Sequence, residues 1–233
     1  MDKTLYVYIN NNLEGSLTNN ENGKISFQYD KNAKMPLSLS LPLQNELYTE
    51  EKCHGFFNGL LPENDETRRM IARKYGINAN SDFAILKAIG YDCPGAISFI
   101  SDKSNSDLAE YYEIKGKAIN TEELEKFINE LPQKPLGTGV KDLRLSLAGA
   151  QTKTAVLLIN NEIHLPDRHT PTSHILKPAI KGLKETVENE YICLKVAEKL
   201  GIRTPEVKIC NAGKTKFLLI ERFDREIQNN KIK

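Results

Sequence analysis

The sequence predicts an α+β protein with two units. The first is a small N-terminal antiparallel β meander or barrel with helices, and the second is an antiparallel sheet with one main helix. Three observations support this prediction. Strand-like segments with period-two alternation occupy the first 45 residues, and segments with helical spacing and capping residues follow between residues 64 and 131. A stretch rich in Pro and Gly at 132–139 then separates the units, which we assign to residues 1–131 and 141–233.

Composition excludes several classes of protein. The 233 residues carry a formal net charge of +1 and are 39% hydrophobic, which is ordinary for a folded soluble chain. No basic cluster predicts direct binding to nucleic acid, and no apolar run approaches the roughly 18 residues that a membrane span needs. The four cysteines are scattered, without a C-x-x-C pair or another metal-ligand pattern. We therefore expect a cytoplasmic protein without a signal peptide, a membrane segment or a metal site.

The first unit is expected to begin with a series of short strands. Residues 5–9, 13–17 and 24–29 are separated by Asn-rich turns, whose residues tolerate left-handed backbone. In the third of these segments, apolar and polar residues alternate as in a half-buried strand. A fourth strand is expected at 37–41, because Leu and Ser alternate strictly there between two prolines.

Capping residues predict the helices that follow. Asn64 or Asp65 precedes a helix at 66–75, and Ser81 precedes a helix at 82–89; a glycine follows each of them. The remaining elements expected in this unit are a strand at 96–100 and a helix that begins at Asn120 with a capping box.

The second unit is expected to open with a loop and a strand within 146–159. A turn and a polar connection through Pro166 and Pro171 then lead to further elements: a strand at 173–177, a helix at 186–200, and strands at 206–210 and 216–221. We expect Leu200 on the apolar face of that helix. The resulting order of strand, strand, helix, strand, strand is that of the small lobe of a protein kinase.

Small and hydroxyl side chains crowd residues 145–154, directly before a strand. Such residues allow backbone N–H groups to approach an anion closely. The next strand ends in Lys177, which can place a positive charge on the same anion. We therefore interpret 148–153 and Lys177 as a nucleotide-phosphate site. The stretch matches neither G-x-x-x-x-G-K-[ST] nor G-x-G-x-x-G, so the spacing alone also fits a polar connection between two strands.

A kinase small lobe pairs its strand lysine with a glutamate on the helix. The helix at 186–200 offers Glu188 and Glu190. Glu190 follows Val187 by three residues and precedes Leu194 by four, which directs it along the inward edge of the helix. We predict that Lys177 pairs with Glu190. The alternative is a solvated glutamate on the helix surface, which is common.

Several segments resemble the HipA family in sequence and order, and together they span the chain. This family comprises the serine/threonine kinase toxins of bacterial HipBA-type toxin–antitoxin pairs. The segments that carry the resemblance are 56–63, 90–96, 146–154, 170–177, 188–191 and 221–225.

The resemblance implies a nucleotide site in the second unit and a β-rich subdomain in the first. Ser146 would be the serine that these kinases phosphorylate on themselves, and a phosphate there would repel the phosphates of ATP. Glu221, Arg222 and Phe223 would form a hinge that reads adenine through backbone groups, with Asp224 near the ribose. The implied phosphate contacts are Ala148, Gly149, Ala150, Gln151, Thr152 and Lys153 from the loop, and Lys177 held by Glu190.

The resemblance also implies partners, namely a HipB-like DNA-binding antitoxin and a protein substrate such as an aminoacyl-tRNA synthetase. A kinase needs an aspartate, an asparagine and a second, Mg²⁺-binding aspartate after the hinge. Residues 225–233 contain no such set, so we expect the kinase C-terminal lobe to be absent from this chain. The chain alone would then be inactive, and Mg²⁺ would bind with ATP only if that lobe were supplied.

Three interpretations of this difference stay open. The chain could be a remnant of a kinase, or one half of a split kinase whose C-terminal lobe is encoded separately. It could instead be a non-enzymatic protein that binds an antitoxin or a kinase lobe.

Overall fold

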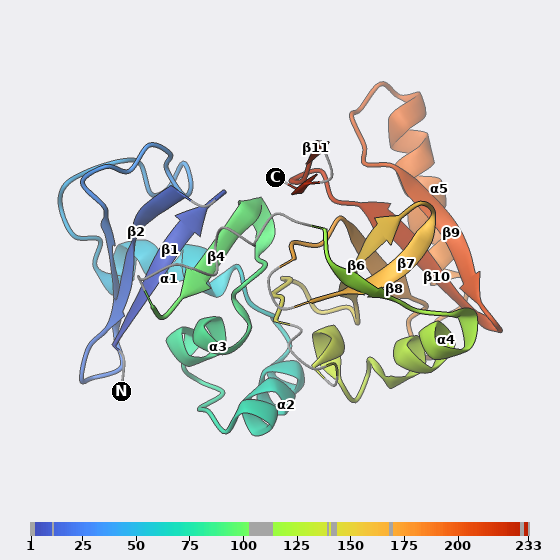
Figure 1. The fold of residues 1–233 in the computed structure, drawn as a ribbon, viewed down its shortest axis with the longest axis horizontal. Coiled ribbons are helices and arrows are strands. Elements are labelled where there is room, and N and C mark those ends of the chain that lie inside the picture. Colours follow the sequence, from blue (N-terminus) through green and yellow to red (C-terminus); the bar gives the residue numbers. More distant parts are fainter. Residues whose placement is uncertain are drawn as a thin grey trace.

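The protein folds into two units that lie side by side, as the computed structural model shows (Figure 1). The structure describes residues 3–10, 12–102, 114–138, 140, 144–167, 170–228 and 231–232. Both units combine antiparallel sheets with helices, so the predicted α+β class is confirmed. Among the described helices, none is both long and apolar enough to cross a membrane.

The N-terminal unit is built on a four-stranded antiparallel sheet in the order β3-β2-β1-β4. Its strands are β1 (Thr4–Ile9), β2 (Asn12–Asn19), β3 (Ile25–Tyr29) and β4 (Ile97–Ile100). The inward rings of Phe27 and Phe99 pack on Phe57, with centroid separations of 5.5 and 5.9 Å. Gly15 makes this close packing possible, because a Cβ there would lie 2.6 Å from the Phe27 ring.

Three helices complete this unit: α1 (Glu50–Asn58), α2 (Asp65–Tyr75) and α3 (Asp82–Ile89). The side chains of Asn64 and Ser81 cap α2 and α3, as predicted. Helix α1 was not predicted, and Gly55 inside it lowers the helical propensity of the segment. Thr49 precedes the helix but makes no side-chain cap bond. Two acidic residues in its first turn, Glu50 and Glu51, are the signal that favours a helix there.

The strand predicted at 37–41 is wrong. The segment turns instead: the Leu41 N–H donates to the Ser38 carbonyl at 3.0 Å, and the Ser40 N–H donates to the Ser38 hydroxyl. The serine side chains satisfy the backbone locally, which competes with strand pairing. Leu39, the middle leucine of the alternating pattern, is fully exposed.

The C-terminal unit contains a six-stranded sheet in which all pairs are antiparallel. The predicted polar connection around Pro166 is wrong, because β7 forms a hairpin there with β6. Asn160 and Asn161 close that hairpin with φ of 51° and 64°, which the paired asparagines tolerate. In spatial order, the strands are β5 (Gly116–Ala118), β7 (Glu162–Pro166), β6 (Thr154–Ile159), β8 (His174–Pro178), β10 (Thr215–Glu221) and β9 (Val207–Ala212).

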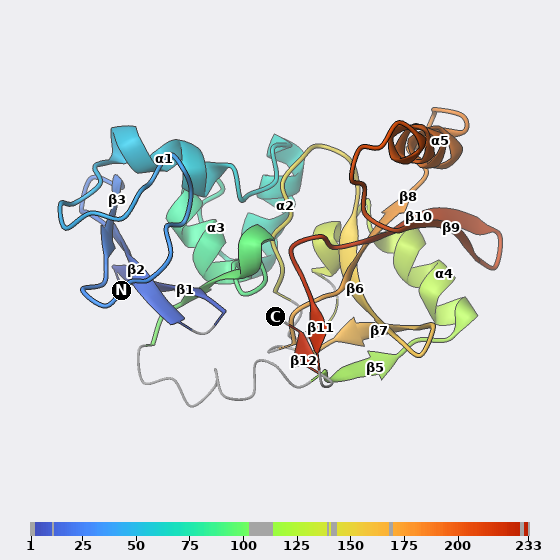
Figure 2. The same cartoon turned by 90° about the horizontal axis from the view of Figure 1, so that it is seen from above.

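Helices α4 (Thr121–Glu130) and α5 (Thr186–Lys199) cover opposite faces of this sheet (Figure 2). Alternate residues of β10 enter two cores: Phe217 joins the core beneath α4, and Leu218 joins the core beneath α5. Leu200 was predicted to face inward, but it is 74% exposed because it lies beyond the last turn of α5. A short hairpin of β11 (Ile227–Gln228) and β12 (Lys231–Ile232) ends the described chain.

Around residue 132, the chain passes from the C-terminal unit back to the N-terminal unit. Strand β5 and helix α4 pack with the C-terminal sheet, although the sequence analysis assigned residues up to 131 to the first unit. The following single turn η2 (Pro135–Gly137) returns to the N-terminal unit, where Leu136 and Leu147 join its core. A second single turn, η1 (Pro94–Ala96), precedes β4. The segments before and after η2 therefore tie the two units together.

Candidate functional site

A cleft of about 820 Å³ lies between the two units and gathers most of the predicted site residues. It is bordered by the segment before β6, the end of β8, the inner edge of α5 and the segment after β10. Thr152 is the one predicted contact that lies elsewhere, since it borders two neighbouring depressions. The predicted residues that line the cleft are Ala148, Gly149, Ala150, Gln151, Lys153, Lys177, Glu190, Glu221, Arg222, Phe223 and Asp224.

The N-terminal unit forms the other wall of this cleft, which sequence reasoning did not anticipate. Phe56 and Leu60 contribute apolar surface from α1 and the turn after it, and Pro94 and Gly95 contribute the turn before β4. These residues belong to segments that carried the family resemblance, at 56–63 and 90–96. Their position gives those segments a role as a wall of the site.

The loop at 148–153 contains a glycine with left-handed backbone next to a lysine side chain. Gly149 has φ of +97°, a conformation that L side chains rarely adopt, and a Cβ there would lie 2.9 Å from the Lys153 Nζ. The Lys153 ammonium folds back to donate to the Gln151 carbonyl at 3.1 Å. Burial, and then the nearby charge of Lys177, lower the pKa of Lys153. Two positive charges therefore face one small volume, which favours an anion between them.

The predicted pair between Lys177 and Glu190 forms. The Lys177 Nζ donates to the Glu190 Oε1 at 2.5 Å, and both side chains are mostly buried. Glu188, the other candidate, pairs instead with Lys216 of β10, and neither of these residues lines the cleft. The inward placement of Glu190 follows from its spacing to Val187, which is buried in the core between α5 and the sheet.

Ser146 lies at the base of the loop, where it is fully buried. Its hydroxyl donates to the Leu60 carbonyl at 2.6 Å, and its N–H donates to the Asp92 carbonyl at 3.1 Å. The adjacent Leu145 forms an isolated parallel bridge with Asp92. The start of the loop is therefore bound to the N-terminal unit through both the side chain and the backbone of Ser146.

The segment 221–224 continues directly from β10. The N–H groups of Glu221 and Arg222 donate to the carbonyls of Glu206 and Ser173, each at 2.9 Å. Phe223 follows with 91% of its surface exposed. The backbone of this predicted hinge is thus fixed by neighbouring segments up to Arg222, and its next side chain points away from the protein.

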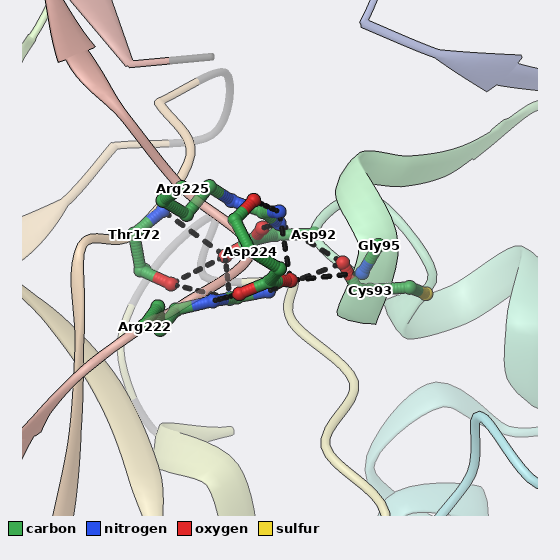
Figure 3. A network of polar contacts seen from close by, with 7 residues as sticks. All are labelled: Asp92, Cys93, Gly95, Thr172, Arg222, Asp224 and Arg225. Atoms are coloured by element: carbon green, nitrogen blue, oxygen red, sulfur yellow. Dashed lines mark hydrogen bonds and ion pairs between the residues drawn. The ribbon is translucent and has the colours of Figure 1, made fainter. Parts of the chain in front are cut away.

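The Asp224 carboxylate is engaged by protein donors on both oxygens (Figure 3). Its Oδ2 accepts from Arg222 at 2.8 Å, Arg225 at 2.9 Å and the Gly95 N–H at 2.8 Å, whereas its Oδ1 accepts from Arg222 at 3.0 Å. Burial opposes ionisation, but the hydrogen bond and charge of Arg222, then Arg225, lower the pKa of Asp224 to about 2. Oδ1 keeps capacity for one more donor, such as a ribose hydroxyl.

Asp92 completes this network from the N-terminal unit (Figure 3). It accepts from the Thr172 hydroxyl at 2.6 Å, from Arg222 at 3.1 Å and from Arg225 at 2.6 Å. The Cys93 carbonyl accepts from the same two arginines. Asp92 is fully buried, and although burial opposes it, the charges of the arginines hold the pKa of this carboxyl below its usual range. A carboxylate of this kind is ionised and strongly held.

Sequence reasoning missed Asp92, Thr172 and Arg225 as parts of the site. Asp92 and Thr172 lie inside segments that resembled the family, and Arg225 follows the predicted hinge directly. Nothing in their local spacing indicates that they meet, because 80 and 133 residues separate Asp92 from its partners Thr172 and Arg225. Within the described part of the chain, no group of three or more His, Cys, Asp or Glu side chains is placed to hold a metal ion.

Comparisons with known proteins agree across both units. The model of the HipA N-terminal domain matches residues 5–100, and the model of the HipA-like C-terminal domain matches residues 145–233. A putative kinase, Y4mE of Sinorhizobium fredii, is 34% identical over 230 residues, covering 96% of this chain and 54% of its own length. The serine/threonine-protein kinase toxin HipA of Shewanella oneidensis is 31% identical over 190 residues, covering 82% of this chain and 42% of its own.

A solved structure extends the similarity to three dimensions. It is the complex of HipA, HipB and operator DNA from the toxin–antitoxin system of Shewanella oneidensis MR-1. The match has a TM-score of 0.78 at 28% identity, and covers 97% of this chain and 52% of that one. The chain thus spans about half the length of the curated relatives and the solved structure that it matches.

Proposed function

The chain belongs to the HipA family, and from that premise we propose that residues 1–233 form the ATP-binding part of a serine/threonine protein kinase toxin. The observation that carries the proposal is the Lys177–Glu190 pair, which lies in one cleft with the loop at 148–153 and the segment 221–224. Protein kinases use such a lysine, held by a helix glutamate, to contact the α- and β-phosphates of ATP.

The phosphates would lie between the loop and the lysines. Backbone N–H groups around Gly149 can approach them closely, and Lys153 and Lys177 can add charge from two sides. Glu190 keeps Lys177 extended into the cleft, so that the ammonium is positioned before the nucleotide arrives. Without a ligand, the positive charges of Lys153 and Lys177 repel each other. A bound anion would compensate both charges and remove that repulsion.

The base would be read by the hinge at 221–223. The N–H groups of Glu221 and Arg222 are already used within the protein, so the donor to adenine would be the Phe223 N–H. Asp224 can still accept a ribose hydroxyl on its Oδ1 while its Oδ2 stays with Arg225 and Gly95. Ser146 would have to leave the Leu60 carbonyl before its hydroxyl could receive a phosphate.

Binding and phosphate transfer are separate expectations. A kinase needs aspartates that position the substrate hydroxyl and hold Mg²⁺. The acidic residues that line the described cleft are Glu190, Glu221 and Asp224, of which Glu190 is paired with Lys177 and Asp224 with two arginines. For residues 1–233 on their own, we therefore expect nucleotide binding without phosphate transfer.

A HipB-like DNA-binding antitoxin is the partner that we propose. The support for it is the match to HipA in a complex with HipB and operator DNA, which extends over nearly the whole of this chain. Co-purification of this chain with the product of a neighbouring antitoxin gene would test this part of the proposal separately from nucleotide binding.

Titration calorimetry of residues 1–233 with ATP tests the central proposal. We expect saturable one-to-one binding, with weaker binding of GTP, and no transfer of labelled phosphate to the protein. The absence of any heat or fluorescence change at millimolar ATP would contradict the proposal. Labelled phosphate appearing on the isolated chain would leave ATP binding intact and contradict only the expectation on transfer.

A further inference from the structure

A buried carboxylate of the N-terminal unit holds both ends of the segment that would read the base. Asp92 lies in the turn between α3 and β4, outside the C-terminal sheet. Its two oxygens accept from Arg222 at 3.1 Å and from Arg225 at 2.6 Å (Figure 3). These arginines flank Phe223 and Asp224, so one carboxylate contacts the chain on both sides of those two residues.

Beyond β10, the hinge is held mainly through Arg222 and Arg225, which bond to Asp92 and to the Cys93 carbonyl. The Phe223 side chain is 91% exposed and makes no core contact that would fix its backbone. Asp224 is held through Arg222, Arg225 and the Gly95 N–H, and Gly95 belongs to the same turn as Asp92. The position of the Phe223 N–H therefore depends on contacts that converge on the turn 92–95.

Loss of the Asp92 carboxylate should affect binding of the base more than binding of the phosphates. The loop at 148–153 is tied to the same turn through the Asp92 main-chain carbonyl, which accepts from the Ser146 N–H at 3.1 Å. A change confined to the Asp92 side chain leaves that bond in place, but removes one of the two carboxylates that the arginines share, the other being Asp224. Loss of the carboxylate would then disturb base recognition selectively.

We propose that Asp92 is a positioning residue, which acts through Arg222 and Arg225 to place the hinge backbone and so sets the preference for adenine over guanine. This inference rests on the proposed nucleotide function. Adenine presents an acceptor ring nitrogen to a backbone N–H, whereas guanine presents a donor at the same position. A displaced N–H therefore weakens ATP binding more than GTP binding.

A buried ion pair could instead serve stability alone, and the chain contains a matched control. Asp82 is also buried, at 8% exposure, and pairs with Arg68 inside the N-terminal unit. Its other partners are Asn58 and His54, and it lies outside the cleft lining. Removal of the Asp82 charge takes a buried carboxylate away from Arg68, as removal of the Asp92 charge takes one away from Arg222 and Arg225, but without any contact to the hinge.

The experiment compares Asp92→Asn with Asp82→Asn in the full 233-residue chain. Thermal unfolding measures stability, and displacement of a fluorescent ATP analogue measures the dissociation constants of ATP and GTP. We expect both variants to lose stability, but only Asp92→Asn to lower the ratio of ATP to GTP affinity, by about tenfold, since displacement of a contact group by about 1 Å has large effects. Asp82→Asn should stay within about twofold of the wild type in that ratio.

If Asp92→Asn does not fold, Thr172→Val carries the test, because it removes one donor to Asp92 and one acceptor of Arg222 while every charge stays in place. A smaller fall in the ATP to GTP ratio is then expected. An unchanged ratio in the folded variant, an equal fall in Asp82→Asn, or a wild type that binds both nucleotides equally would overturn the inference. A wild type that binds neither nucleotide would instead overturn the proposed function.

Discussion

The Lys177 ammonium lies 2.5 Å from the Glu190 carboxylate, and this contact joins the strand beneath the cleft to the helix beside it. Lys216 and Glu188 make a second ion pair between the same helix and the sheet, and neither residue lines the cleft. The two pairs are chemically alike but differ in position. Variants of the two pairs therefore distinguish a role in nucleotide binding from a role in holding α5 against the sheet.

Lys177→Ala should lower the affinity for ATP by about tenfold or more, because a charge-assisted contact to a phosphate contributes roughly 1.5–3 kcal/mol. Calorimetric titration with ATP measures this loss. Glu188→Ala removes the control pair from a residue that does not line the cleft, and it should leave the ATP affinity unchanged. For both variants, the free energy of unfolding should stay within about 1 kcal/mol of the wild type. Equal ATP affinities for Lys177→Ala and the wild type would show that the cleft binds no phosphate at this lysine.

The backbone at Gly149 gives a second test of the phosphate loop. Gly149→Ala introduces a Cβ at a residue with φ of +97°, and places it 2.9 Å from the Lys153 ammonium. We expect a loss of stability of about 1–2 kcal/mol from the left-handed backbone, together with weaker ATP binding because Lys153 must move. Urea unfolding and ATP titration measure the two effects.

Gly182→Ala is the matched control for that substitution. Gly182 has φ of +85° but has no atoms within 4 Å of a built Cβ, and it lies in a turn outside the cleft. The control should lose similar stability and keep the ATP affinity of the wild type. Weaker ATP binding in both variants would point to a general loss of folded protein rather than to the loop.

The sequence was sufficient where local spacing determines position. The inward face of α5 follows from helical periodicity, so the partner of Lys177 could be chosen between Glu188 and Glu190 before the structure was known. The strand predicted at 37–41 failed because serine hydroxyls satisfy the backbone in a turn that has the same alternating pattern. Strand β7 was missed although Ile163 and Leu165 alternate with polar residues as in a strand, because the run is short and ends at a proline.

The arrangement between the units could not be predicted in this way. Asp92 meets Arg222 across 130 residues of sequence, and no periodicity relates the two positions. The same holds for α4, whose capping box was predicted correctly although the helix packs on the sheet of the following unit. A capping box predicts the residue at which a helix begins, but the sheet against which the helix packs depends on tertiary contacts.

The packing of α4 is itself testable. Leu124→Ala should destabilise the protein by about 2–5 kcal/mol, because Leu124 is buried in the core between α4 and the C-terminal sheet. Glu122→Ala, at an exposed position of the same helix, should stay within about 0.5 kcal/mol. Chemical denaturation monitored by circular dichroism measures both. A small effect of Leu124→Ala would mean that α4 does not stabilise that sheet.

The stability of the folded protein at acid pH should depend on the Asp224 network. The arginines lower the pKa of Asp224 to about 2 from an ordinary value of 3.8, so its ionised form stabilises the folded state. This contribution is fully present above pH 4 and is lost as the pH falls from about 4 to 2, and it amounts to roughly 2 kcal/mol. Asp224→Asn should therefore be less stable than the wild type at pH 7, and the difference should shrink at pH 2.

Thermal unfolding at several pH values measures this difference between Asp224→Asn and the wild type. Glu21→Gln is the control, because Glu21 forms an exposed pair with Lys3 and contributes little at any pH. The control curve should follow the wild type throughout the range. If Asp224→Asn were also to follow the wild type between pH 2 and 7, the Asp224 carboxylate would not stabilise the folded state, and Asp92 would be the carboxylate that holds the two arginines.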